Sequence, residues 1–267
     1  MSTAAPWRKL VQGACGECRG LLLALIAGIS LAVAFAFPAT AETPCPAGPG
    51  FSLRLPHLRA ALDSRTEGLI VALGSSSTAG AAASDLAHSY PAELQAALSA
   101  SLRRAHVAVI NRGIGGQDAP EELSRLDADV IALHPQLVIW QVGANGALRN
   151  EDPAMFRAMV TVGVRRLQSA GADVILMDSQ HSALIMASAD HQALEESLAE
   201  VATGTGANLF SRGELMDAWA EEGAPPSEFL ASDGLHQNDR GYVCVAQALA
   251  ADIVAGLHEK LPLSASR

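Results

Sequence analysis

Four short apolar runs, each bounded by polar residues or glycine, constrain the fold of this chain more than any other feature. They are Leu69 to Leu73, Val107 to Ile110, Leu137 to Val142 and Val174 to Met177. Their length and β-branched content are typical of buried parallel strands. Segments with helical periodicity lie between and after them, at 91–104, 121–134, 153–170, 191–202 and 239–257. This alternation predicts a three-layer α/β domain, in which helices cover both faces of a parallel sheet.

The N-terminal region has the pattern of a secretory signal peptide. An uncharged, mostly apolar run spans 21–37, with Arg8, Lys9 and Arg19 before it and Ala39-Thr40-Ala41 after it. A basic segment, an apolar segment and a small-x-small site predict cleavage after Ala41, and therefore export to the periplasm or the medium with no membrane attachment. The alternative is an uncleaved membrane anchor, because the run approaches the ~20 residues needed to cross a bilayer.

The chain after residue 41 is expected to begin with an irregular leader at 42–60, since its first part is rich in Pro and Gly. Residues 61–267 are then a single domain. Cys15 and Cys18 would leave with the signal peptide, so only Cys45 and Cys244 would reach an oxidising compartment. They either form a bridge to the last helix or remain two separate thiols, and the sequence leaves both alternatives open.

The charge of the chain argues against nucleic acid as a partner. Lys and Arg number 18 against 28 Asp and Glu, which gives a formal net charge of −10. No cluster of basic residues offsets that charge, so polyphosphates would be repelled. The histidines lack the spacing of a metal site. We therefore expect a neutral or compact substrate and no metal or cofactor.

Small polar residues follow three of the predicted strands, and an acid and a histidine precede the last helix. The turns are Gly74-Ser75-Ser76-Ser77-Thr78-Ala79-Gly80, Asn111 to Gln117 and Gly143-Ala144-Asn145-Gly146, and the last motif is Asp233-Gly234-Leu235-His236. A serine hydroxyl is a weak nucleophile that needs an imidazole as base and a carboxylate to orient that imidazole. A phosphate-binding loop is the rival interpretation of the first turn, but the Gly-Lys-Ser/Thr ending is missing.

In this order the four motifs resemble those of the SGNH hydrolases, also called the GDSL family. The first matches Gly-Asp-Ser-x-Thr-x-Gly with Ser75 in place of the Asp, and the second matches Asn-x-x-x-x-Gly from Asn111 to Gly116. The third matches Gly-x-Asn-Asp with Gly146 in place of the Asp, and the last matches Asp-x-x-His without departure. The resemblance implies a flavodoxin-like domain and a serine esterase.

The resemblance also implies a role for each matched residue. Ser76 would be the nucleophile, His236 the base and Asp233 its orienting acid, while Ser76, Gly116 and Asn145 would form the oxyanion hole. A register error of one would instead make Ser75 or Ser77 the nucleophile. His181 follows the fourth predicted strand and is expected to shape the substrate site.

The expected substrate is a carboxylic ester with a short acyl or O-acetyl group, carried by a carbohydrate, a lipid or a small molecule. One alternative is acyl transfer to a sugar hydroxyl. Another is an inactive carbohydrate-binding or envelope factor on the same fold, an idea that Ser75 and Gly146 prompt.

Overall fold

The computed structural model describes residues 44–64, 67–103 and 105–259. Pro44 onward forms one compact unit. The predicted signal peptide, its cleavage site and the Cys15-x-x-Cys18 motif lie outside the described residues.

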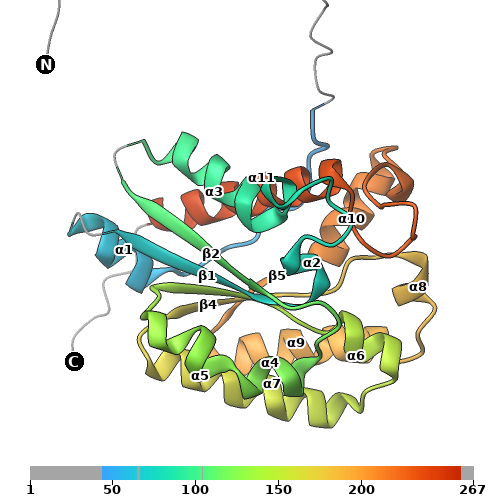
Figure 1. Cartoon of the computed structure of the whole chain (residues 1–267), viewed down its shortest axis with the longest axis horizontal. Coiled ribbons are helices and arrows are strands. Elements are labelled where there is room, and N and C mark those ends of the chain that lie inside the picture. The colour runs from blue at the N-terminus through green and yellow to red at the C-terminus, as the bar shows by residue number, and fades with distance from the viewer. Residues whose placement is uncertain (1–43, 65–66, 104, 260–267) are drawn as a thin grey trace, which may run out of the picture. The chain divides into compact units, whose positions relative to one another are not determined.

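All strands of the sheet run parallel, in the order β2-β1-β3-β4-β5 (Figure 1). They are β1 Gly68–Gly74, β2 Val107–Gly113, β3 Leu137–Gln141, β4 Asp173–Met177 and β5 Asn208–Phe210. The chain reverses its direction of winding at β1, which pairs with both β2 and β3. In sheets of this kind, ligands bind beyond the carboxyl ends of the strands at such a switch point.

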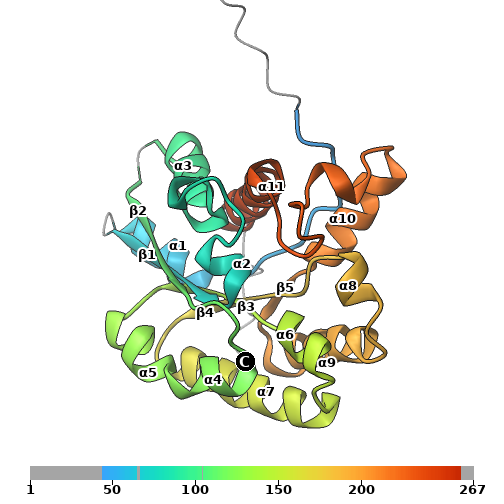
Figure 2. The same cartoon turned by 45° about the vertical axis from the view of Figure 1, so that its right-hand side comes forward.

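Helices cover both faces of the sheet, as the two views agree (Figures 1 and 2). One face carries α1 Pro56–Asp63, α3 Tyr90–Ser101, α10 Arg212–Glu221 and α11 Asp239–His258. The other carries α4 Ala119–Ser124, α5 Leu126–Asp129, α6 Ala144–Arg149, α7 Pro153–Ser169 and α9 His191–Thr205. The remaining short elements are α2 Ser76–Ala79, α8 Ala183–Met186, η1 Leu86–His88, η2 Ile131–Leu133 and η3 Pro226–Glu228.

The apolar strand residues divide between two cores. In β1, Ile70 and Ala72 pack under the α3 and α11 face, whereas Val71 and Leu73 pack under the α7 face. Because side chains alternate along a strand, a continuously apolar run fills both cores. This explains why the predicted strands have no polar positions in their middle.

Two expected element boundaries differ in the structure, and one strand was not expected. Residues 56–60, expected within the irregular leader, are helical and belong to α1, because Pro56 suits a first turn and Leu58 is buried in the core. The helix expected at 121–134 is divided into α4, α5 and η2, with a break at Arg125 (φ −104°, ψ 4°). β5 was not expected from the sequence, because its three residues are too few for a periodic pattern.

Among the described helices, α11 alone is long and apolar enough to cross a membrane by length and composition. Its apolar side chains Val245, Leu249 and Ile253 are buried in the core of the domain. Cys244 of this helix forms a disulfide with Cys45, so the segment before α1 is tied to α11.

Candidate active site

Ser76, His236 and Asp233 form a continuous hydrogen-bonded chain at the carboxyl end of β1. The Ser76 Oγ lies 2.8 Å from His236 Nε2, although 160 positions separate the two residues. His236 Nδ1 lies 2.7 Å from Asp233 Oδ2. The imidazole thus contacts the hydroxyl on one side and a carboxylate on the other, which is the geometry in which a histidine can accept a serine proton.

The loop before α11 orients Asp233 toward the ring. Its Oδ1 accepts hydrogen bonds from the backbone amides of Leu235 and His236, each at 2.9 Å. The hydrogen bond to His236, followed by these amides, lowers the pKa of Asp233 to about 2. The carboxylate is therefore ionised at neutral pH and holds Nδ1 as the protonated nitrogen.

The two neighbouring serines are turned away from the imidazole. Ser75 is buried, and its amide and hydroxyl both bond the Gln141 Oε1, at 3.2 and 3.3 Å. Ser77 is also buried and faces Gln180. Of the three consecutive serines, Ser76 is the one whose hydroxyl reaches His236, and it is the first residue of α2.

The second turn lies next to Ser76. Gly116 has φ +81°, a conformation that side chains disfavour, and a Cβ there would meet no atom within 4 Å. A Cβ on Gly115 would lie 3.9 Å from the Ser76 Cβ, so this loop passes beside the nucleophile candidate. The space beside Gly116 can therefore admit a ligand atom.

Asn145 joins the third turn to the second. Its Nδ2 donates to the Gln117 carbonyl at 2.7 Å. A side-chain amide nitrogen carries two protons, so one remains for another acceptor. Asn145 thus bonds the loop that passes beside Ser76. The first amides of a helix, such as that of Ser76 in α2, lack partners within their own helix.

Other side chains occupy the space around the two positions that depart from the family pattern. Ser75 shares Gln141 Oε1 with Thr78, whose hydroxyl lies 3.1 Å from that oxygen. At Gly146, a Cβ would lie 2.5 Å from the Glu151 Oε2, so the carboxyl of Glu151 fills that volume. Burial is the first cause that raises the pKa of Glu151.

His181 lies beyond the carboxyl end of β4, but both of its ring nitrogens are engaged. Nε2 lies 3.1 Å from Glu195 Oε1 and Nδ1 lies 2.9 Å from Asp217 Oδ1. The hydrogen bond to Glu195, assisted by Asp217, raises the pKa of His181 to about 9. At neutral pH it is an imidazolium between two carboxylates, so it has no nitrogen with which to accept a proton.

A buried polar cluster behind the site was not anticipated from the sequence. Arg212, fully buried, donates through Nη2 to the Asp178 carbonyl at 2.9 Å and to Gln180 Oε1 at 2.7 Å. Gln180 in turn donates to the Leu235 carbonyl at 2.9 Å, one residue before His236. The charged interior of the domain is thus linked to the histidine loop.

Two further arginines support the turns around Ser76. Arg125 donates through Nη2 to the Gly74 carbonyl at 3.1 Å and through Nε to Gln117 Oε1 at 2.6 Å. Arg149 donates to the Gly116 carbonyl at 2.6 Å. Neither arginine could be recognised from helical periodicity. Arg125 lies at the break between α4 and α5, and Arg149 ends the short helix α6.

In the part of the chain that the structure describes, no group of three or more His, Cys, Asp or Glu side chains is arranged to hold a metal ion.

Solved structures with similar folds include a two-domain esterase active on acetylated mannans, with 20% identity and a TM-score of 0.66. The match covers 80% of this chain but only 58% of the length of that esterase. A lipase/acylhydrolase from Enterococcus faecalis is 24% identical (TM-score 0.60, covering 73% of this chain and 100% of that one). A psychrotrophic esterase from Pseudoalteromonas sp. is 22% identical (TM-score 0.60, 72% and 100%). A comparison with curated proteins finds no sequence match.

Strand order, helical layers and these likenesses show that the chain has the fold of the SGNH hydrolase structures. It belongs to the non-GDSL lipase-like family, whose model matches residues 44–259. The replacement of the Asp of Gly-Asp-Ser by Ser75 agrees with that description.

Proposed function

We propose that the protein is an exported serine esterase that hydrolyses carboxylic esters with a short acyl or O-acetyl group through an acyl-enzyme on Ser76. The observation that carries the proposal is the unbroken chain from Ser76 Oγ through His236 to Asp233, with distances of 2.8 and 2.7 Å. A serine rarely meets a histidine and its carboxylate in this way across 160 positions of chain without a chemical role. Acetyl esterases among the structures of similar fold support the choice of acyl group.

In the first half-reaction His236 Nε2 removes the Ser76 proton while Oγ attacks the ester carbonyl carbon. Asp233 stabilises the imidazolium that forms, and the amides of Ser76 and Gly116 with the side chain of Asn145 bind the oxyanion. The imidazolium then gives its proton to the leaving alcohol. In the second half-reaction His236 activates a water molecule, which releases the acid and restores Ser76.

The export part of the proposal is supported by the basic and apolar segments of 1–41 and the site after Ala41. The Cys45 and Cys244 pair is consistent with an oxidising compartment. N-terminal sequencing of the protein recovered from the periplasm or medium tests it, and a mature chain that begins at Glu42 is expected. A full-length chain in the membrane fraction would favour the anchor instead.

Active-site labelling with a fluorophosphonate, together with hydrolysis of a short-chain nitrophenyl ester, tests the catalytic part. Ser76→Ala should lose labelling and lower the rate by a factor on the order of 10⁴ or more. Ser99→Ala, on the exposed side of α3, is the matched control and should keep both. A folded wild-type protein that neither labels nor hydrolyses would favour the binding-factor alternative, and product formed on an added sugar would favour acyl transfer.

A further inference from the structure

Ser76 stands at the start of a helix that is too short to hold its own position. α2 has four residues, and its N-cap residue Ser75 makes no side-chain hydrogen bond to the helix. Isolated helices of fewer than ~12 residues are marginal in water, so contacts with the rest of the domain must fix such a turn. The place of the Ser76 hydroxyl therefore depends on the residues that bond α2 from outside.

The side-chain oxygen of Gln141 bonds residues on both sides of Ser76. Gln141 is the last residue of β3 and is fully buried. The Ser75 amide donates to its Oε1 at 3.2 Å and the Ser75 hydroxyl at 3.3 Å, and the Thr78 hydroxyl donates to the same oxygen at 3.1 Å. One oxygen thus holds the residue before Ser76 and the residue two positions after it.

The backbone amide of Ser75 determines which way the Gln141 side chain is turned. An N–H group can only donate, so the side-chain atom that faces it must be the oxygen. The Thr78 hydroxyl also lies 3.5 Å from the Tyr90 hydroxyl. Burial raises the pKa of Tyr90 to about 12, so Tyr90 keeps its proton at neutral pH and can donate it to Thr78. The proton of Thr78 is then left for Gln141.

Gly74 leaves the space that the Gln141 side chain needs. A Cβ on Gly74 would lie 2.9 Å from Gln141 Oε1, closer than real Cβ contacts allow, and would also meet the Thr78 hydroxyl. Beyond Gln141 the chain continues directly into the turn that carries Asn145. Gln141 therefore connects the turn of Ser76 with the strand from which the turn of Asn145 departs.

The nitrogen of the Gln141 side chain makes this arrangement costly. Nε2 is buried and makes no hydrogen bond to any of the residues that the structure describes. An unpaired buried amide nitrogen lowers stability relative to an apolar side chain of similar size. A glutamine at this position is therefore better explained by the place it gives to α2 than by stability.

We infer that Gln141 is a positioning residue for the proposed reaction, whose side-chain oxygen holds α2 so that Ser76 Oγ reaches His236 Nε2 at 2.8 Å. The inference rests on the proposed esterase function and adds to it a residue that acts through Ser75 and Thr78. A displacement of about 1 Å can lower a rate about 10²-fold, so loss of this oxygen should act on kcat and leave substrate binding unchanged.

The opposite end of β3 offers a matched control. Gln136 directly precedes β3, and its Oε1 accepts a hydrogen bond of 2.8 Å from the Leu69 amide of β1. Both glutamines thus join the neighbouring strands β1 and β3 through one side-chain oxygen. The difference is that Gln141 does so beside Ser76.

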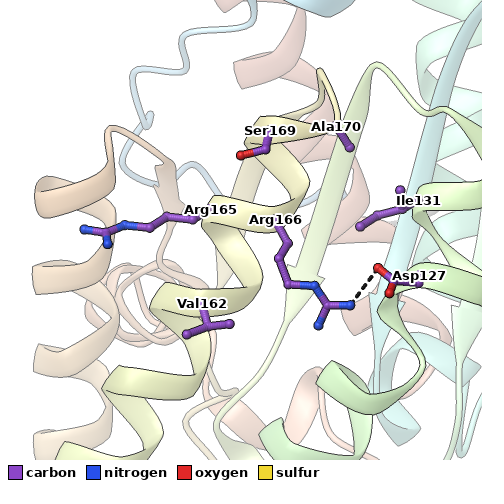
Figure 3. A pocket seen from close by; sticks show the side chains of 7 residues that line it. All are labelled: Asp127, Ile131, Val162, Arg165, Arg166, Ser169 and Ala170. Atoms are coloured by element: carbon purple, nitrogen blue, oxygen red, sulfur yellow. Dashed lines mark ion pairs between the residues drawn. The ribbon is translucent and has the colours of Figure 1, made fainter.

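The amino end of the sheet, where Gln136 lies, is away from the four motifs, which follow strands or precede α11. A cavity of about 540 Å³ lies at this end, since Ala170 lines it three residues before β4 begins. Figure 3 shows the ion pair between Arg166 and Asp127 across it. A substitution of Gln136 therefore changes a bond between β1 and β3 without touching the candidate active site.

Hydrolysis of a short-chain nitrophenyl ester and the rate of fluorophosphonate labelling test the inference. Gln141→Met keeps the length of the side chain but has no oxygen, so kcat and the labelling rate should fall about 10- to 100-fold while KM stays within about twofold. Gln141→Glu keeps an accepting oxygen and should turn over at least about fivefold faster than Gln141→Met. Gln136→Met should keep kcat within about twofold of the wild type, even where its midpoint in urea unfolding falls.

Thr78→Val provides a second measurement in case Gln141→Met does not fold. It removes one donor to Gln141 Oε1 and keeps the shape of the side chain, so kcat should fall about three- to tenfold with KM unchanged. A folded variant of either kind with the kcat of the wild type, a loss that falls on KM, a Gln141→Glu protein as slow as Gln141→Met, or an equal loss in Gln136→Met would overturn this inference and leave the esterase intact. A wild type that hydrolyses no ester and binds no fluorophosphonate would overturn both proposals.

Discussion

The guanidinium of Arg149 donates a hydrogen bond of 2.6 Å to the carbonyl of Gly116, from the last residue of α6 to the loop after β2. Its second nitrogen, Nη1, lies 2.5 Å from Asp118 Oδ2, and Asp118 caps α4. Arg149 therefore fixes both ends of the short segment from Gly116 to Asp118, whose first residue is the proposed oxyanion donor. Arg149 itself lies outside the four family motifs.

Arg149→Ala should lower kcat by about 10- to 100-fold with little change in KM, because the Gly116 amide would lose its fixed position; complete loss of an oxyanion donor costs about 10²- to 10³-fold. Arg149→Lys should restore part of the rate. Arg157→Ala is the matched control, since Arg157 pairs with Glu200 on exposed helix surface. Steady-state kinetics distinguishes the roles: a raised KM with unchanged kcat would mean that Arg149 binds substrate.

Gln180 connects the buried guanidinium of Arg212 to the loop of His236. Gln180→Ala should lower the free energy of unfolding by about 2–4 kcal/mol, because it leaves a buried charge short of a partner. It should also lower kcat, since the Leu235 carbonyl loses its donor. Urea unfolding and steady-state kinetics measure both effects.

Gln180→Glu separates the two effects. A carboxylate would keep the contact with Arg212, so the free energy of unfolding should stay closer to that of the wild type than in Gln180→Ala. It has no proton to donate to the Leu235 carbonyl, so kcat should still fall. Gln192→Ala, on the exposed side of α9 where Gln192 bonds Glu196, is the control. If Gln180→Ala unfolds like the control variant, the link to Arg212 contributes no stability.

The sequence predicted the parts of the fold that depend on local periodicity. The predicted runs at 69–73, 107–110, 137–142 and 174–177 each correspond to a strand, because a strand buried on both faces is apolar throughout. β5 was missed because it has three residues, one of which is the polar Asn208, whose side chain bonds the backbone of Arg54 and Val174.

The triad residues could be named in advance because each follows a strand or precedes a helix at a spacing that motifs preserve. Arg149, Arg212 and Gln180 could not, because their role depends on contacts between residues 30 or more positions apart. A charged residue such as Arg212 is normally expected on the surface, so its burial can be recognised only in three dimensions.

The disulfide between Cys45 and Cys244 closes a loop of 199 residues and ties the segment before α1 to α11. Cys45→Ser should lower the free energy of unfolding by about 2–5 kcal/mol, because the unfolded chain loses a long-range constraint. Its kcat should match that of the wild type, since Cys45 contacts none of the triad residues.

Adding a reductant to the wild type should give the same loss of stability in urea unfolding, and should not affect the variant. A wild type insensitive to reductant would contradict the bridge.

His181 should make stability depend on pH between neutrality and about pH 9. Its pKa is raised from 6.5 to about 9 in the folded protein, first by the hydrogen bond to Glu195 and then by Asp217. A raised pKa means that the folded state holds the proton more tightly, so the stabilisation is complete below pH 6.5 and is lost as pH rises through 9. We expect this stabilisation to be on the order of 1–2 kcal/mol, because Asp217 is largely exposed and solvent screens the pair.

Urea unfolding of His181→Gln at two pH values tests this. Its midpoint urea concentration should be lower than that of the wild type at pH 6 and nearly the same at pH 9.5. His106→Gln, on an exposed loop, should follow the wild type. If His181→Gln is destabilised equally at both pH values, the histidine contributes through packing against Gly213 and not through its charge.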